Sequence, residues 1–116
     1  MRLLVCGGRD FNDPLLLTRT LDRWAKCEII DCVIEGNARG ADRMAGFWAR
    51  KNGIMNLKFT PDWKTHGKTA GVLRNQQMLT EGRPDVVLAF PGGRGTEDMI
   101  RRTEAAGIAV CRILSP

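Results

Sequence analysis

The chain has 116 residues, of which 43% are hydrophobic and 27% are charged. A chain of this length and composition forms an ordinary hydrophobic core, so we expect residues 1–116 to fold as a single domain. No stretch approaches the roughly 18 consecutive apolar residues that a membrane span requires. The opening MRLLVCGGRD has too short an apolar run for a signal peptide, so we expect a cytoplasmic protein without a membrane partner.

The net charge of +5 favours an anionic partner such as a nucleotide, a phosphate or a nucleic acid. The basic residues are scattered along the chain, so an ordinary solvated surface explains them equally well. Of the four cysteines, three lie in strand-like apolar runs and Cys27 ends a helical one, which favours buried free thiols over disulfides. The spacing from Cys27 to Cys32 does not suit zinc, and we expect neither a metal nor a cofactor.

The first element is the apolar run RLLVCG (2–7), which predicts a strand covered on both faces. Asp13 and Pro14 then form a good N-cap and first-turn pair. Apolar residues recur at helical spacing after them, so a helix is predicted to about Lys26.

DCVIEG (31–36) predicts the second strand, and an apolar stripe from residue 41 predicts a second helix that ends near Gly53. IMNLKF (54–59) predicts a weaker third strand. The polar segment TPDWKTHGK (60–68) contains proline and glycine, so we interpret it as a loop, long enough to form a flap over a site.

The remaining elements follow in the same alternation. A third helix is predicted through residues 73–78, and PDVVLAF (84–90) is the clearest strand. GTEDMIRRTEAAG (95–107) predicts the fourth helix and IAVCRIL (108–114) the fifth strand.

Strands that alternate with helices predict right-handed crossovers and a parallel sheet, here a Rossmann-like three-layer α/β/α domain with strand order 3-2-1-4-5. In that order the chain reverses direction between strands 1 and 4, and ligands bind where the loops leave those strands. The two loops are CGGRDF (6–11) and PGGRGTED (91–98), and both are rich in glycine.

Glycines let backbone N–H groups approach a ligand, and a following helix start adds free donors and a positive dipole end. A phosphate is therefore the expected ligand, although a tight strand-to-helix turn would also explain the glycines. GNARGAD (36–42) repeats the pattern with Asp42 as a candidate cap, and three loop arginines suit phosphate oxygens. The predicted ligand-binding residues are Gly7, Gly8, Arg9, Asp10, Gly36, Arg39, Gly40, Asp42, Asn75, Gly92, Gly93, Arg94, Gly95 and Thr96.

Three of the polar and aromatic residues near these loops have alternative interpretations. Asn75 could hydrogen-bond a base, a ribose or the neighbouring loop, and Asp10 a ribose hydroxyl or its own turn. Trp63 could stack on a base or anchor the flap to the core.

Four motifs in order resemble the SLOG superfamily, a Rossmann-like group that holds the LOG phosphoribohydrolases and the DprA and YpsA proteins. They are most similar to its small YspA-type, cpYpsA-related family of bacteria and phages. The motifs are GGRDF (7–11), GNARGAD (36–42), DWKTHGKTAGVLRNQQM (62–78) and FPGGRGTEDM (90–99). The resemblance covers nearly the whole chain and implies a site for a nucleotide or a nucleotide derivative on the glycine loops.

The resemblance also implies candidate catalytic residues. LOG enzymes cleave the N-glycosidic bond of nucleoside monophosphates with an arginine, which falls on Arg74, and a glutamate, which falls on Met99. Methionine cannot stabilise an oxocarbenium ion or transfer a proton, which disfavours LOG-type hydrolysis. Asp98 precedes Met99 and is the substitute candidate, although it points about 100° away on a helix and equally suits the helix dipole.

We therefore expect a sensor or sequestering protein for a nucleotide-derived ligand. The alternatives are a LOG-type phosphoribohydrolase, a single-stranded nucleic-acid binder of DprA type, and an interaction module whose site is vestigial. The absence of an aromatic stacking series argues against nucleic acid. The pairing of family members through helices implies a homodimer.

Overall fold

The computed structural model describes residues 1–114, whose five parallel strands form one sheet in the order β3-β2-β1-β4-β5. The strands are β1 (Arg2–Cys6), β2 (Cys32–Glu35), β3 (Met55–Lys58), β4 (Val86–Ala89) and β5 (Ala109–Arg112). The predicted strand order and parallel arrangement are confirmed. Each strand is shorter than its predicted run, and the flanking residues differ in burial: Phe90 is buried, whereas Leu114 is 78% exposed.

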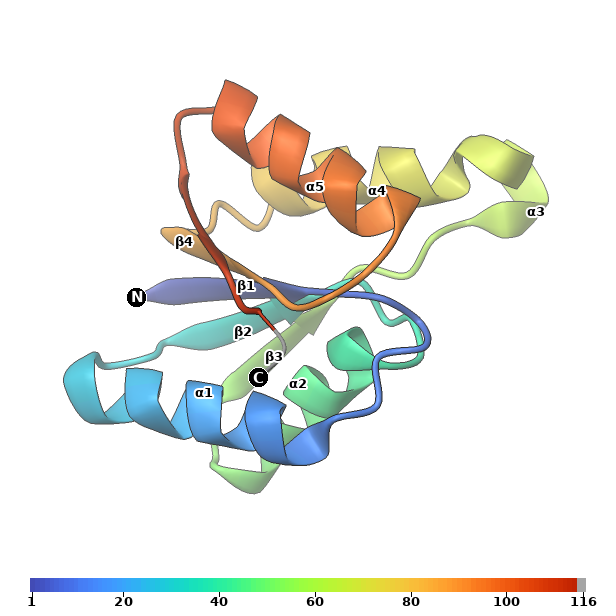
Figure 1. The fold of residues 1–116 in the computed structure, drawn as a ribbon. Coiled ribbons are helices and arrows are strands. Elements are labelled where there is room, and N and C mark those ends of the chain that lie inside the picture. The colour runs from blue at the N-terminus through green and yellow to red at the C-terminus, as the bar shows by residue number, and fades with distance from the viewer. Residues whose placement is uncertain (115–116) are drawn as a thin grey trace.

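Helices cover both faces of this sheet. They are α1 (Pro14–Cys27), α2 (Ala41–Lys51), α3 (Trp63–His66), α4 (Ala70–Thr80) and α5 (Arg94–Ala105). Figure 1 shows α1 and α2 on one face and α4 and α5 on the other, with α3 beyond the carboxyl ends of the strands. The arrangement confirms the predicted Rossmann-like α/β fold.

The central strand β1 shows why its run is apolar throughout. Leu3 and Val5 belong to the core beneath α1 and α2, whereas Leu4 and Cys6 belong to the core beneath α4 and α5. Successive side chains of a strand point to opposite faces, so a strand between two helical layers needs an apolar residue at every position.

The prediction of a loop over residues 60–68 is wrong. The segment contains the short helix α3 and the 3-10 turn η1 (Gly67–Thr69). The Asp62 carboxylate accepts the backbone N–H of Thr65 at 3.1 Å and so caps α3. The composition of the segment suggested a loop, and the Asp-x-x-Thr cap was the signal to the contrary.

All four cysteines are free thiols, but the expectation that they are buried holds only in part. Cys6 and Cys32 are buried, Cys111 is partly buried, and Cys27 is exposed. Burial raises the pKa of the Cys6 thiol, which keeps it protonated and unreactive at neutral pH. Within residues 1–114, no helix is long and apolar enough to cross a membrane, and no three side chains gather as metal ligands.

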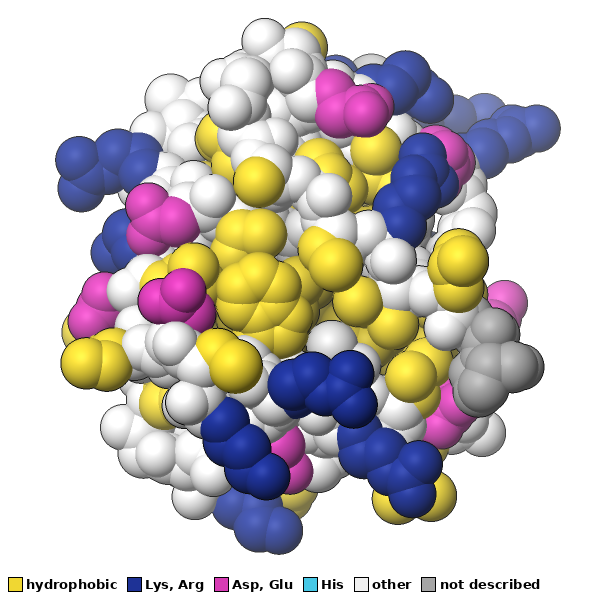
Figure 2. All heavy atoms as spheres, turned by 60° about the vertical axis from the view of Figure 1, so that its left-hand side comes forward, with side chains coloured by type: hydrophobic (Ala, Val, Ile, Leu, Met, Phe, Trp, Pro, Cys, Tyr) yellow, Lys and Arg dark blue, Asp and Glu magenta, His cyan; other side chains and the backbone are white. Residues whose placement is uncertain are grey.

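Figure 2 brings the left-hand side of Figure 1 forward and shows hydrophobic side chains gathered in the centre of that face. On the side of the sheet that α1 and α2 cover, Trp24, Cys111 and Ile113 are only partly buried. β5 is an edge strand that pairs with β4 alone among the described residues. The homodimer that the resemblance implies stays a prediction.

We predict that Gly40→Ala lowers the free energy of unfolding by at least about 2 kcal/mol. Gly40 has φ of 86°, and a Cβ there would overlap the carbonyl oxygen of Gly8. Gly53→Ala is the control, because φ is 69° but no atom lies within 4 Å of the added Cβ. It should cost only the left-handed strain, about 1 kcal/mol. Urea unfolding measures the free energy of both variants. Equal losses would contradict close packing of the loop at Gly40 on the loop at Gly8.

Candidate ligand-binding cleft

A cleft of about 670 Å³ opens where β1 and β4 end, at the predicted point of chain reversal. Its volume is in the range of small-molecule sites. Twelve predicted site residues line it: Gly7, Gly8, Arg9, Asp10, Asp42, Arg74, Asn75, Gly92, Gly93, Arg94, Gly95 and Thr96. The other four, Gly36, Arg39, Gly40 and Asp98, lie outside the lining.

The loops after β1 and β4 contact each other directly. The Gly8 N–H donates to the Pro91 carbonyl oxygen at 2.9 Å. A Cβ at Gly92 would lie 2.6 Å from the Gly8 nitrogen and would overlap the Thr96 hydroxyl. Packing of one loop on the other therefore explains the glycines at 8 and 92.

Packing does not explain Gly93 and Gly95. Neither has a positive φ, and no atom lies within 4 Å of a Cβ built on either residue. The backbone at both positions is exposed at the cleft. The fold would accept a side chain at either position. The two glycines therefore leave the backbone accessible to a ligand.

Helix α5 begins at this bare backbone. Its N-cap is Gly93, and no side chain among the described residues caps it, whereas Asp13 caps α1 and Asp62 caps α3. The first N–H groups of an uncapped helix lack acceptors and carry the positive end of the helix dipole. The start of α5 is therefore able to accept an anion in the cleft.

The charges that line the cleft are mainly positive. Arg9, Lys68, Arg74 and Arg94 line it, against two acids, Asp10 and Asp42. Asp10 forms an exposed ion pair with Arg39 at 3.0 Å. Arg39 also donates to the carbonyl oxygen of Arg9, so it braces the loop after β1 from outside the cleft.

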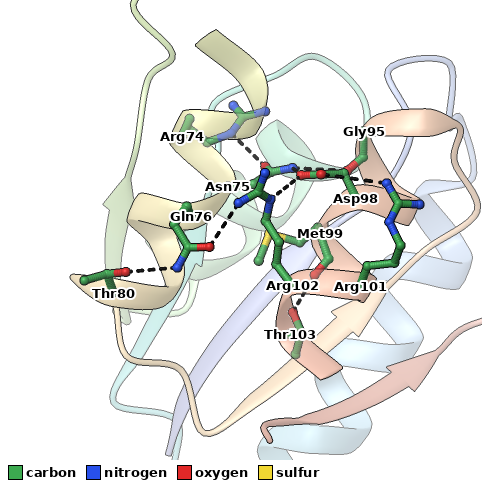
Figure 3. Close-up of polar contacts among 10 residues, drawn as sticks. All are labelled: Arg74, Asn75, Gln76, Thr80, Gly95, Asp98, Met99, Arg101, Arg102 and Thr103. Atoms are coloured by element: carbon green, nitrogen blue, oxygen red, sulfur yellow. Dashed lines mark hydrogen bonds and ion pairs between the residues drawn. The ribbon is translucent and has the colours of Figure 1, made fainter. Parts of the chain in front are cut away.

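Arg74 is positioned by its neighbour Asn75 (Figure 3). The Arg74 Nε donates to Asn75 Oδ1 at 3.1 Å, and Nη1 donates to the Gly36 carbonyl oxygen. The Asn75 Nδ2 donates to the Gly95 carbonyl oxygen at 3.2 Å and to Asp98 Oδ2 at 3.0 Å. The sequence suggested a base, a ribose or the neighbouring loop as the partner of Asn75, and within the chain it bonds Gly95 of that loop, in the first turn of α5. Asn75 thereby fixes Arg74 relative to the start of α5.

Asp98 lies between α4 and α5 instead of in the cleft. Its carboxylate accepts from Asn75 and, at 2.8 Å, from Arg102, which also donates to Gln76 at 3.0 Å. Met99 is buried and does line the cleft. The methionine therefore lines the cleft together with Arg74, whereas the neighbouring acid does not.

Asp42 is the buried acid of the cleft. Gly40 is the N-cap of α2, so Asp42 lies in the first turn and is not the cap residue we expected. It is 5% exposed, and its Oδ2 accepts the Ala38 N–H at 3.3 Å. Burial raises the pKa of Asp42 to about 7, although Arg74 acts in the opposite direction. Burial also lowers the pKa of Arg74, and Asp42 offsets part of that effect.

Residues of α3 and η1 form a wall of the cleft that the sequence analysis only partly found. Trp63 lines the cleft and is 46% exposed, with the Arg9 guanidinium 5.5 Å from its ring centroid. This is a cation–π contact. Lys68 was missed, although it lies in the same motif as Trp63.

Comparisons with known proteins agree with this architecture. The model of a family described as "YspA, cpYpsA-related SLOG family" matches residues 1–66. The Gene 61 protein of Mycobacterium phage D29 is 40% identical over 117 residues, which cover 94% of this chain and 93% of that protein. This relative agrees with the bacterial and phage distribution of the family that the motifs resemble.

A solved structure is similar in fold. UDP-GlcNAc 2-epimerase from Methanocaldococcus jannaschii superposes with a TM-score of 0.52 at 18% identity. The match covers 97% of this chain and 31% of the epimerase, so the chain spans about a third of that enzyme. At this identity the likeness concerns the fold alone.

We predict that Asn75→Ala lowers the free energy of unfolding by about 2 to 3 kcal/mol. The change leaves Asp98, the Gly95 carbonyl and the Arg74 Nε each without one hydrogen-bond partner. Gln77→Ala is the control on the exposed side of α4 and should change the value by less than about 0.5 kcal/mol. Urea unfolding measures both, and similar small losses would contradict a role of Asn75 in joining α4 to α5.

A second prediction concerns pH. Because the pKa of Asp42 rises from 3.8 to about 7 on folding, the folded state holds this proton more tightly than the unfolded state. Its contribution to stability is present at pH 4 and is lost as the pH rises to 7. The unfolding free energy of the wild type, minus that of Asp42→Asn, should fall between pH 4 and pH 8 by on the order of 3 to 4 kcal/mol.

Urea unfolding of both proteins at each pH measures this difference, and the subtraction removes the titration of the other carboxylates. A difference that stays constant with pH would show that Asp42 ionises normally in the folded protein.

Proposed function

The chain belongs to the YspA, cpYpsA-related SLOG family, and we propose that it binds a nucleotide-derived phosphate ligand as a sensor or sequestering protein. The observation that carries the proposal is the uncapped start of α5 beside Gly93 and Gly95. The fold does not require glycine at either position, and both line the cleft.

The phosphate of the ligand binds at the N–H groups of the first turn of α5. Arg94 lies in that turn, and Arg9 lies on the opposing loop. Arginine side chains and a helix N-terminus together favour a phosphate group over a neutral ligand. The excess of basic side chains in the cleft supports the same choice.

The base of the ligand lies against Trp63. This indole is half exposed at the cleft, and its contact with Arg9 holds it there. Stacking on an aromatic ring accommodates any base, because every base has a π-face. The exposed indole of Trp63 in α3 therefore supports a nucleotide over a simple phosphate.

Binding without hydrolysis is favoured by the side chains at 98 and 99. Met99 occupies the position of the LOG glutamate, and Asp98 is engaged by Asn75 and Arg102 outside the cleft. Neither side chain is able to act on a glycosidic bond in the cleft.

Isothermal titration of the purified protein with AMP, GMP, ADP-ribose, NAD and cyclic nucleotides tests the proposal. We expect saturable binding of at least one nucleotide. Arg94→Ala should weaken it about 10-fold to 100-fold, because a charged hydrogen bond contributes about 1.5 to 3 kcal/mol. Arg23→Ala removes the same charge on the exposed side of α1, outside the cleft lining, and should leave the affinity unchanged.

Gly95→Ala separates ligand binding from folding. An alanine in the first turn of α5 should raise the free energy of unfolding by up to about 1 kcal/mol. The same methyl group should weaken nucleotide binding at least about tenfold if the ligand lies against this backbone. Unchanged affinity in both Gly95→Ala and Arg94→Ala, or no binding of any nucleotide, would overturn the proposal.

Two alternatives give different results in the same samples. Chromatography of the titrated nucleotides would detect a free base if the protein is a phosphoribohydrolase. A nucleic-acid binder would instead retain short single-stranded DNA with a steep dependence on salt concentration. The net charge of +5 is the observation behind this second alternative.

A further inference from the structure

Two charged side chains in the cleft have no part in phosphate binding at α5. Asp42 comes from α2 and is 5% exposed, and Arg74 comes from α4 and is half-buried. Both line the cleft. Each lowers the electrostatic cost of burying the other, but neither forms an ion pair with any residue between 1 and 114.

The bonds within the protein leave part of each group available. Nε and Nη1 of Arg74 have partners in Asn75 and Gly36, while Nη2 has no hydrogen-bond partner among the described residues. Oδ2 of Asp42 accepts from Ala38. The cleft therefore presents a guanidinium donor and a carboxylate acceptor that come from different layers of the fold.

A second phosphate does not suit this place. Above about pH 7, where Asp42 is ionised, its buried carboxylate repels an anion strongly, since few water molecules screen the charge. The start of α5 suits the phosphate better, because the two acids that line the cleft, Asp10 and Asp42, both come from other elements. Beside an ionised Asp42, a ligand group that donates a hydrogen bond is therefore favoured over an anion.

A hydroxyl group meets both requirements, because it donates to a carboxylate and accepts from a guanidinium. Asn75 bonds both Arg74 and the Gly95 carbonyl, so the guanidinium keeps a fixed position relative to the phosphate site. One ligand that carries both a hydroxyl and a phosphate is therefore able to contact both places at once.

We propose that Asp42 and Arg74 form a hydroxyl-binding subsite, so that the cleft selects a phosphorylated sugar with free hydroxyl groups. This inference rests on the proposed phosphate site at α5 and adds specificity to it. The sugar is either the ribose of a nucleotide or a free sugar phosphate, and both offer the same chemistry to Asp42 and Arg74.

Titration calorimetry with matched ligands tests the subsite. The probes are AMP, its 2′-deoxy and 3′-deoxy analogues, ribose 5-phosphate, 2-deoxyribose 5-phosphate and inorganic phosphate. We expect AMP or ribose 5-phosphate to bind at least about tenfold tighter than the analogue that lacks the contacted hydroxyl, because that analogue gives up the hydrogen bonds to Asp42 and to Nη2 of Arg74. Tight binding of AMP alone identifies a nucleotide, and equal binding of ribose 5-phosphate identifies a sugar phosphate.

Asp42→Asn should reduce this preference to less than about threefold and should leave the affinity for inorganic phosphate within about twofold. Glu104→Gln is the control, an exposed carboxylate of α5 outside the cleft lining, and should keep the full preference. The preference of the wild type is measured without any variant, so a poorly folded Asp42→Asn protein would not prevent the test.

The outcomes separate the two proposals. Equal affinity of the wild type for AMP and both deoxy analogues would overturn the hydroxyl subsite and leave the phosphate site standing. A preference that persists in Asp42→Asn would overturn the role of Asp42. No binding of any probe, inorganic phosphate included, would overturn the phosphate site and the subsite together.

Discussion

The close contact between the loops after β1 and β4 is the constraint on which the candidate site depends. The two strands are neighbours in the sheet, and the Gly8 N–H bonds the Pro91 carbonyl across the point where the chain reverses direction. Side chains at 8 and 92 would push the loops apart. Because the loops touch, the start of α5 faces the loop of Arg9 across a single cleft.

A second set of contacts fixes Arg74 relative to that helix. The Asn75 side chain bonds Arg74, Gly95 and Asp98, and Arg102 links the Asp98 carboxylate to Gln76 of α4. A change in the packing of α4 on α5 therefore moves the guanidinium and the bare backbone together.

Burial determines the character of the charges in the cleft. Asp10 is exposed and paired with Arg39, so solvent screens its effect on an anion. Asp42 is buried, and its pKa is raised to about 7 because burial disfavours the charged carboxylate. One cleft thus combines an exposed cationic rim, suited to phosphate, with a buried acid that favours a neutral donor.

The sequence by itself determined the fold and the edge of the sheet at which the candidate cleft lies. Apolar runs such as RLLVCG and the glycine loops gave the strand order and the edge where twelve predicted residues meet, because periodicity and connection rules are local properties. Only the tertiary structure placed Arg39 and Asp98 outside the cleft, buried Asp42 within it and brought Lys68 to its wall. Those outcomes depend on which partner each side chain meets across elements, and spacing along the chain does not encode that.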